Sequence, residues 1–297
     1  MFEGVMMRGV DKVSMAVRLP DGGIDTEIFK ARSVRETNAL LRLPFVRGIV
    51  SFIESIRLSY KCLYKSMAKA GIEDAPAESR FEKWLVRVFG EKLMSVVITI
   101  GMVLGVGLSI FLFLLVPTAI SRGIDLLIPL GMWKAGVEGA IKIILFVAYI
   151  GVAYSLPEMR RITQYHGAEH KTIACYEKGL DLTIENTRSM SPYHPRCGTS
   201  FILIVLIISI ILFLGVSVNN VFARIGLKLL MLPLVMGITF ELIKLAGRYD
   251  NWFTRILSAP GMWLQRITAK EPEDGMLEVA ITSMEGVITG NPKDDAW

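Results

Sequence analysis

The sequence predicts a mainly α-helical, polytopic membrane protein with about four transmembrane helices, a small N-terminal β element and amphipathic helices at the membrane surface. Three observations lead to this fold class. The 297 residues are 52% hydrophobic and their mean hydropathy is +0.48, which is high for a soluble domain. Several apolar stretches are long enough for a bilayer that needs about 20 residues per helix. Lys and Arg are unevenly divided between the segments that join these stretches.

Residues 1–44 are expected to form a cytoplasmic β-hairpin element. Residues 12–18 alternate, with Val13, Met15 and Val17 on one side, and a Pro/Asp/Gly-rich turn at 19–23 leads into a second extended run. This pattern is typical of a β-hairpin. A secretory signal would place an apolar run directly after a positive start, and the first 90 residues are mixed in character. The N-terminus is therefore expected to stay in the cytoplasm.

Residues 45–92 are expected to form an amphipathic interfacial helix and a linker. From Phe45 to Met67, apolar residues recur at steps of three and four, and the basic residues between them are Arg47, Arg57, Lys61 and Lys65. A basic amphipathic helix of this kind can lie in the inner headgroup layer. The alternative is a helix that packs on the protein's own cytoplasmic part. Residues 70–79 contain Gly71 and Pro76 and predict a linker.

Residues 93–247 contain the four expected spans. Leu93–Val116 and Gly198–Ala223 carry no charge, whereas Gly139–Leu156 contains Lys142. The fourth, Ile225–Ala246, contains Lys228 near one end and Glu241 inside. Lysines near helix ends can reach the headgroups. The short apolar stretch Leu126–Trp133 is expected at the outer surface.

The distribution of basic residues orients these spans. Arg80, Lys83, Arg87 and Lys92 precede the first span, and Arg160, Arg161, Lys171, Lys178, Arg188 and Arg196 lie in the loop at 157–199. The opposite side holds only Arg122, Lys134 and Arg224. The positive-inside rule therefore predicts a multi-pass protein of the cytoplasmic membrane with that loop and both termini inside. Anionic membrane lipids account for the net charge of +5 without nucleic acid, and a membrane-protein partner is a further option.

The C-terminal tail, residues 248–297, is expected to be cytoplasmic and amphipathic. Residues 252–267 offer aromatic anchors, and residues 273–288 have the pattern of a final surface helix.

Chemistry is concentrated in the loop at 157–199. All three histidines of the chain fall within 29 residues there, and His166 and His170 form an H-x-x-E-H array in a segment with helical character. Positions i and i+4 share a helix face about 6 Å apart, so both imidazoles can reach one cation. Glu169 lies beside that face, where its carboxylate could act as a general base. The array is the inverted form of the zinc-protease motif.

Two histidines do not complete a metal site. The next candidate ligands are His194 and Cys197, an H-x-x-C pair just before the third span. Glu241 is a further candidate because a carboxylate roughly 9 Å inside a span is costly unless it meets a cation. Its alternative role is an ion pair with Lys244, helped by Arg248.

The other cysteines and acids rank lower as ligands. The chain has three cysteines, and an odd number in a reducing compartment argues against a disulfide framework. Cys175 is expected on the opposite side of the helix, where it packs, and Glu177 lies about two turns beyond the array. Mixed nitrogen and sulfur ligands favour zinc. The alternative for the whole cluster is a set of interfacial histidines bonded to lipid phosphates or backbone.

Several motifs resemble those of one known family. They are Glu3–Gly9 (EGVMMRG), Pro44–Gly48 (PFVRG), His166–Lys171 (HGAEHK), His194–Phe201 (HPRCGTSF) and Glu271–Asp274 (EPED). In these stretches the chain resembles the YqhQ-like family of bacterial multi-pass membrane proteins, whose members are described as candidate metal-dependent enzymes. The resemblance runs nearly end to end. It implies a metal site and brings no substrate with it.

Two hypotheses follow from different protein classes. In the first, the chain is a zinc-dependent hydrolase that cleaves an amide or ester of a membrane peptide or lipid. His166 and His170 would bind the metal with one or two of His194, Cys197 and Glu241; Glu169 would be the general base, and Arg196 would steady an anionic intermediate or serve only as a positive-inside anchor. In the second, the metal is structural, and the protein assists transport or the insertion and assembly of membrane proteins. Coordination number separates them, because catalysis needs an open position.

Overall fold

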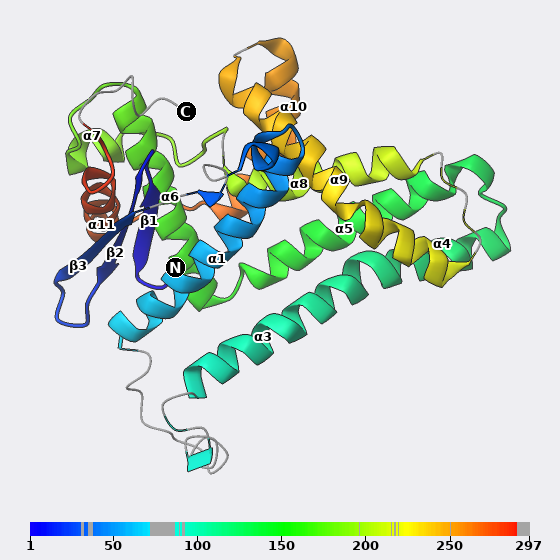
Figure 1. Cartoon of the computed structure of the whole chain (residues 1–297), viewed down its shortest axis with the longest axis horizontal. Coiled ribbons are helices and arrows are strands. Elements are labelled where there is room, and N and C mark those ends of the chain that lie inside the picture. Colours follow the sequence, from blue (N-terminus) through cyan, green and yellow to red (C-terminus); the bar gives the residue numbers. More distant parts are fainter. Residues whose placement is uncertain are drawn as a thin grey trace.

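The computed structural model describes residues 1–30, 33–34, 38–71, 87–88, 90, 93–195, 197–214, 216, 218, 220–249 and 251–289. An N-terminal sheet and the helices that cover it lie at one end of the long axis, and long apolar helices extend from there to the other end (Figure 1). Within the predicted linker, residues 72–79 lie outside the described residues.

The N-terminal sheet is antiparallel in the order β1-β2-β3, with strands β1 (Gly4–Arg8), β2 (Lys12–Arg18) and β3 (Ile24–Lys30). The predicted hairpin is confirmed as β2 and β3. Strand β1 was not predicted. Its sequence GVMMR is short and lacks an alternating polar residue, because both of its faces are covered.

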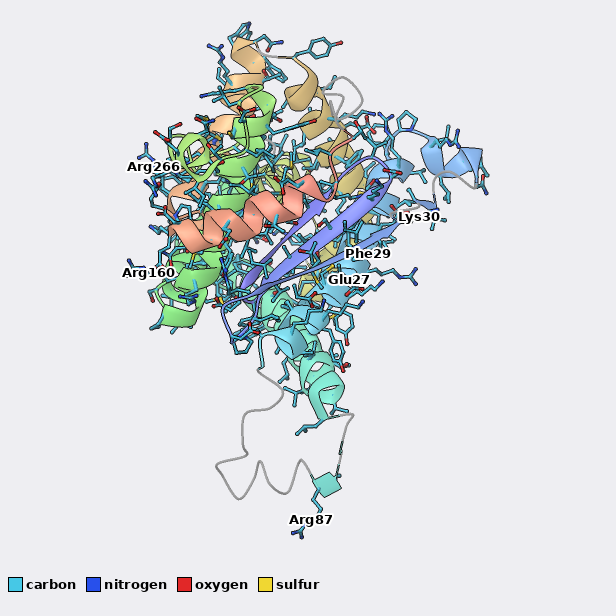
Figure 2. All side chains as sticks on the ribbon, turned by 90° about the vertical axis from the view of Figure 1, so that its left-hand side faces the viewer. Glu27, Phe29, Lys30, Arg87, Arg160 and Arg266 are labelled. Atoms are coloured by element: carbon cyan, nitrogen blue, oxygen red, sulfur yellow. The ribbon has the colours of Figure 1, made fainter. Side chains whose placement is uncertain are left out.

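Both faces of the sheet are buried, and this makes it a middle layer. On one face, Val5, Met7 and Ala16 pack against α11 (Asp274–Glu285) and α6 (Pro157–Glu177). Figure 2 shows α11 lying across the sheet, with Glu27, Phe29 and Lys30 marking the edge strand β3. Period-2 side-chain alternation sends neighbouring residues to opposite layers.

Helix α1 (Val46–Lys69) covers the second face of the sheet. Its Cys62 packs with Met15 and Val17, all three fully buried. Burial of a side chain such as Met15 or Val17 contributes about 1.5–3 kcal/mol. A short 3-10 turn, η2 (Ala39–Arg42), precedes α1. The expected helix is confirmed, and its Cys62 side packs on the protein's own sheet, as the alternative prediction had it.

Long apolar helices form the rest of the molecule. Helix α3 (Leu93–Ile110) continues through a π-helical turn, η4 (Phe111–Leu115), into α4 (Val116–Leu127). The 3-10 turn η5 (Gly131–Trp133) leads into α5 (Lys134–Ala153), which returns beside α4 (Figure 1). Helix α9 spans Val221–Arg248. In the part of the chain that the structure describes, three helices are long and apolar enough to cross a membrane: Val96–Leu127, Lys134–Ala153 and Phe222–Ala246.

Two expected span boundaries differ from the structure. The first helix does not end at Val116 but runs on to Leu127, so it takes up the start of the stretch 126–133 that was expected to be a separate surface piece. The expected third span, 198–223, contains α8 (Gly198–Phe213), whose 16 residues are about 24 Å long against about 30 Å of hydrocarbon. The side chain of Asn220 accepts a hydrogen bond from the backbone N–H of Ala223 and starts a new helix. Hydropathy alone does not reveal this break.

The C-terminal helices tie the two ends of the chain together. Helix α10 (Trp252–Thr268) packs on α8, where Gly261 lets the backbone approach Ser200 closely. The helix expected at 273–288 is present as α11, which packs on the sheet and on α6, and α10 spans the segment that carries the aromatic anchors. A short helix, α7 (Ile184–Arg188), also touches α11. Helix α10 thereby contacts both α8 and α6.

Candidate metal centre

Helix α6 presents the two histidines of the H-x-x-E-H array on one face. Their rings are neighbours, with centroids 4.3 Å apart. The helix begins with Pro157 after an extended Leu156 and stops at Gly179, whose φ of +68° is accessible to glycine at low cost. The predicted start and stop of this segment are therefore confirmed.

Gly167, inside the array, allows a second chain segment to cross the helix. A Cβ at this position would come closer than 3.0 Å to the carbonyl oxygen of Lys270, a separation that real Cβ atoms essentially never show. The backbone N–H of Lys270 donates to the carbonyl of Thr163 at 2.9 Å in the same crossing. As a result, the carbonyl of Thr268 lies directly at His166.

Backbone carbonyls orient both imidazoles. Nδ1 of His166 lies 2.8 Å from the oxygen of Thr268, and Nδ1 of His170 lies 2.7 Å from the oxygen of Pro192. A carbonyl oxygen can only accept, so each Nδ1 carries a proton and donates it. The Nε2 atoms are then the ones available for another partner. Histidines that bind metals in proteins have this second hydrogen bond.

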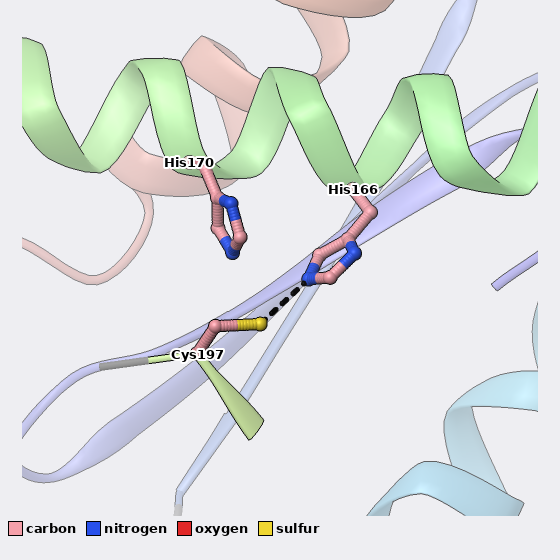
Figure 3. Close-up of side chains that lie close together, drawn as sticks. All are labelled: His166, His170 and Cys197. Carbon is pink, nitrogen blue, oxygen red and sulfur yellow. Dashed lines mark hydrogen bonds between the residues drawn. The ribbon is translucent and has the colours of Figure 1, made fainter. Parts of the chain in front are cut away.

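Cys197 brings a sulfur atom to the same place from the other side (Figure 3). Its Sγ lies 3.2 Å from Nε2 of His166, and as the N-cap of α8 it accepts from the backbone N–H of Thr199 at 3.4 Å. Burial opposes ionisation of the thiol, but the hydrogen bonds and charges of His166 and His170 outweigh it and lower the pKa of Cys197. Desolvation likewise opposes a charged His166, yet the bond to Cys197 raises the pKa of that imidazole. Both shifts favour a thiolate–imidazolium pair at this contact.

The three side chains fit a transition-metal ion. One ligand atom each from His166, His170 and Cys197 lies within 4.8 Å of the other two. Tetrahedral zinc with N and S ligands needs separations of about 3.3–3.8 Å. Small side-chain movements would bring the atoms to that spacing. A nucleophilic cysteine would need only one imidazole as its base. Here backbone carbonyls fix both rings in the same tautomer, with both Nε2 atoms available to bind an ion. This arrangement favours a metal site.

His194 lies next to this group and is not part of it. Its ring centroid is 5.9 Å from that of His170, and its Nε2 is 3.2 Å from a carboxylate oxygen of Glu177. The backbone of His194 is held by the fully buried Gln265, whose amide accepts from its N–H at 2.7 Å and donates to its carbonyl at 2.8 Å. Sequence reasoning missed Gln265. The only signal in the sequence was an amide side chain among the apolar residues of the amphipathic helix α10.

The other predicted residues have different positions. Glu241 accepts a hydrogen bond from Nε of Arg47 at 2.6 Å and forms a second, ionic bond with the same guanidinium. This pair joins α1 to α9, and Glu241 is not among the three candidate ligands. It was predicted as a metal ligand or, alternatively, as the partner of Lys244, and the structure pairs it with Arg47. Glu169 is half-buried, and its carboxylate interacts electrostatically with His166 and with the amino group of Met1. Arg196 lies outside the described residues.

Comparisons with known proteins place these residues in a wider context. Residues 43–290 match the family described as "Protein of unknown function (DUF1385)", and this range includes the whole candidate metal centre. The chain is 34% identical over 287 residues to "Uncharacterized protein YqhQ" of Bacillus subtilis (strain 168). The matched region covers 96% of this chain and 90% of the relative. No solved structure gives a significant match.

Proposed function

The chain belongs to the DUF1385 family, as the resemblance to YqhQ predicted, and we propose that it is a multi-pass membrane protein that binds a zinc-like ion and uses it in hydrolysis at the cytoplasmic membrane surface. One observation carries the metal part. Two imidazoles with backbone-fixed Nδ1 atoms and one cysteine sulfur converge from α6 and α8, with their ligand atoms within 4.8 Å of one another.

The topology that we propose has the α6 side of the molecule in the cytoplasm. Three helices of sufficient length and the shorter α8 support passage through the bilayer, and the excess of Lys and Arg in residues 157–199 supports the orientation. A cysteine introduced at Ser189 should resist an impermeant thiol reagent in intact cells. A cysteine at Leu127, which is 84% exposed between α4 and α5, is the matched outer control. Labelling of Ser189→Cys from outside would contradict this topology.

The roles of the protein's own groups follow from their placement. His166, His170 and Cys197 hold the ion, and three protein ligands leave one position for substrate. A zinc ion supplies Lewis acidity and makes bound water more acidic. Glu169 would accept the proton from water, since its half-buried carboxylate is adjacent to the ligand face and interacts electrostatically with His166. Exposed Trp252, Phe253 and Trp263 on α10 favour a substrate from the membrane, an amide or ester of a peptide or lipid.

A structural ion is the second candidate, and His194 favours it. This histidine is 7% exposed and its ring lies 5.9 Å from that of His170. If His194 turned from Glu177 to the ion, four protein ligands would close the site and hold α6 to the start of α8. The protein would then assist the insertion, assembly or transport work of other membrane proteins without catalysis.

The metal part is tested by metal analysis of protein purified without chelators. We expect about one zinc-like ion per chain, lost in His166→Ala, His170→Ala and Cys197→Ser. Cys175→Ser is the matched control, because Cys175 is equally buried but its thiol points to the carbonyls of Leu180 and Asp181. Protein without stoichiometric transition metal, or equal loss in the control, would remove the basis for both candidates.

Glu169→Gln separates catalysis from a structural role. Glutamine keeps the size of the side chain and removes its basicity, so a hydrolase should retain metal and thermal stability but fail to complement a deletion strain. His194→Ala is measured alongside. If the ion is structural, His194→Ala should lower both metal content and stability, whereas Glu169→Gln should be neutral. Full complementation by metal-loaded Glu169→Gln would refute the hydrolase.

A further inference from the structure

A second cluster of charged residues is buried among the apolar helices, at the end remote from α6. Glu138 of α5 is 2% exposed. It accepts from the hydroxyl of Thr118 in α4 at 3.0 Å and pairs with Arg224 of α9 at 2.8 Å and with Lys228 of the same helix. These bonds join α4, α5 and α9, which lie together on the right of Figure 1.

The charges of this cluster do not balance. Arg224 and Lys228 are 6% and 9% exposed, and both face the single carboxylate of Glu138. Lys142, one turn further along α5, is 9% exposed. In the described part of the chain its ammonium group forms no hydrogen bond or ion pair. Three cations therefore surround one anion, and buried charge without a counter-charge is strongly unfavourable.

The surplus charge faces a pocket. Its lining includes Glu138, Lys142, Arg224, Lys228, Ser209 and Phe213. The hydroxyl of Ser209 already donates to the carbonyl of Leu206 at 2.7 Å, and the Lys228 ammonium is 6.0 Å from the centre of the Phe213 ring. Neither residue compensates Lys142.

The size of the pocket selects the occupant. The space between the side chains holds about one water-sized particle. A water molecule fits but leaves the charge unbalanced, and a phosphate or a carboxylate group is larger. A halide is a single atom, larger than water but smaller than a phosphate or a carboxylate group, and it carries the required sign; a small outward movement of the Lys142 side chain would admit it.

We propose that this pocket binds one small monovalent anion of halide size, with chloride as the usual ligand, held by Lys142 and Arg224. The anion compensates the positive surplus and so stabilises the contact between α5 and α9. The inference does not depend on the metal centre.

Purified protein in nanodiscs tests this site through its thermal unfolding midpoint in sodium chloride, bromide, sulfate and gluconate at equal ionic strength. The midpoint should rise to a plateau with chloride or bromide and stay unchanged with the larger anions. The line width of the chloride-35 NMR signal should increase with native protein. Lys142→Met should abolish both responses and should unfold in gluconate no earlier than the native protein, because the substitution removes an unpaired buried charge.

The matched control is Lys134→Met in the same helix, since Lys134 pairs with Asp125 and does not line the pocket. It should keep the halide response. Equal unfolding midpoints of the native protein in chloride and in gluconate would overturn the proposal. They would mean that the pocket holds water and that the Lys142 side chain is uncharged. A response to sulfate as large as that to chloride, or a halide response that survives in Lys142→Met, would overturn it as well.

Discussion

Gly167→Ala should weaken the metal centre without touching a metal ligand. The added Cβ would lie closer than 3.0 Å to the carbonyl oxygen of Lys270, and that neighbour is backbone, which cannot turn aside. The crossing segment must therefore move away from α6. This movement stretches two hydrogen bonds, from the Lys270 N–H to the Thr163 carbonyl at 2.9 Å and from His166 Nδ1 to the Thr268 carbonyl at 2.8 Å.

The expected size follows from these bonds. Each buried hydrogen bond left unmade is worth about 1–3 kcal/mol, while alanine is favoured over glycine inside a helix by about 1 kcal/mol. For two such bonds, less the helix gain, the free energy of unfolding should thus fall by about 1–5 kcal/mol. Loss of the carbonyl that orients a ligating histidine should lower zinc affinity by about 10- to 100-fold.

The assay is a zinc titration against a competing chelator, combined with chemical unfolding of the same preparations. Gly198→Ala is the control, because it lies next to Cys197 but a Cβ there meets nothing within 4 Å. It should leave affinity and stability near the native values. Native zinc affinity and stability in Gly167→Ala would refute the inference that the crossing at Lys270 orients His166.

Three further predictions test the packing around the site. Gln265→Ala should lower the free energy of unfolding by about 3 kcal/mol, because it leaves the N–H and carbonyl of His194 without partners; Gln164→Ala, which removes one bond to Glu271, should lose less than half as much. The hydrogen bond from Arg161 holds the pKa of Glu3 below its usual range, so this pair stabilises the fold above pH about 4.5 and loses its effect as pH falls through the lowered pKa. The stability gap between native protein and Glu3→Gln should accordingly shrink as the pH falls below about 4.5, and a constant gap would contradict the pairing. Arg47→Met should loosen α1 from α9 by about 1 kcal/mol, since both partners are partly exposed; hydrogen exchange of α1 should accelerate while that of α5 stays unchanged.

Local rules were sufficient for most elements of this chain, although strand β1 and the break between α8 and α9 were not predicted. Hydropathy and three- to four-residue spacing predicted α1, the long apolar helices and the hairpin of β2 and β3, because helix and strand periodicity is written into consecutive residues. The same rule put His166 and His170 on one face, since i and i+4 neighbours meet in any α-helix. Gly179 marked the end of α6 because its positive φ suits glycine.

Tertiary structure decided which distant groups meet. Cys197 and His166 are 31 residues apart, and Arg47 and Glu241 are 194 apart. Spacing along the chain says nothing about such pairs, so Glu241 could be placed only by its need for a cation. The carbonyls of Thr268 and Pro192 were equally out of reach, because every residue has a carbonyl and only packing selects the two that face imidazoles. The sequence by itself placed two candidate ligands, His166 and His170, on one face of α6. Folding brought Cys197 to them as a third candidate and fixed the proton positions of the histidines, because these depend on contacts that form only when α6, α8 and α10 pack together.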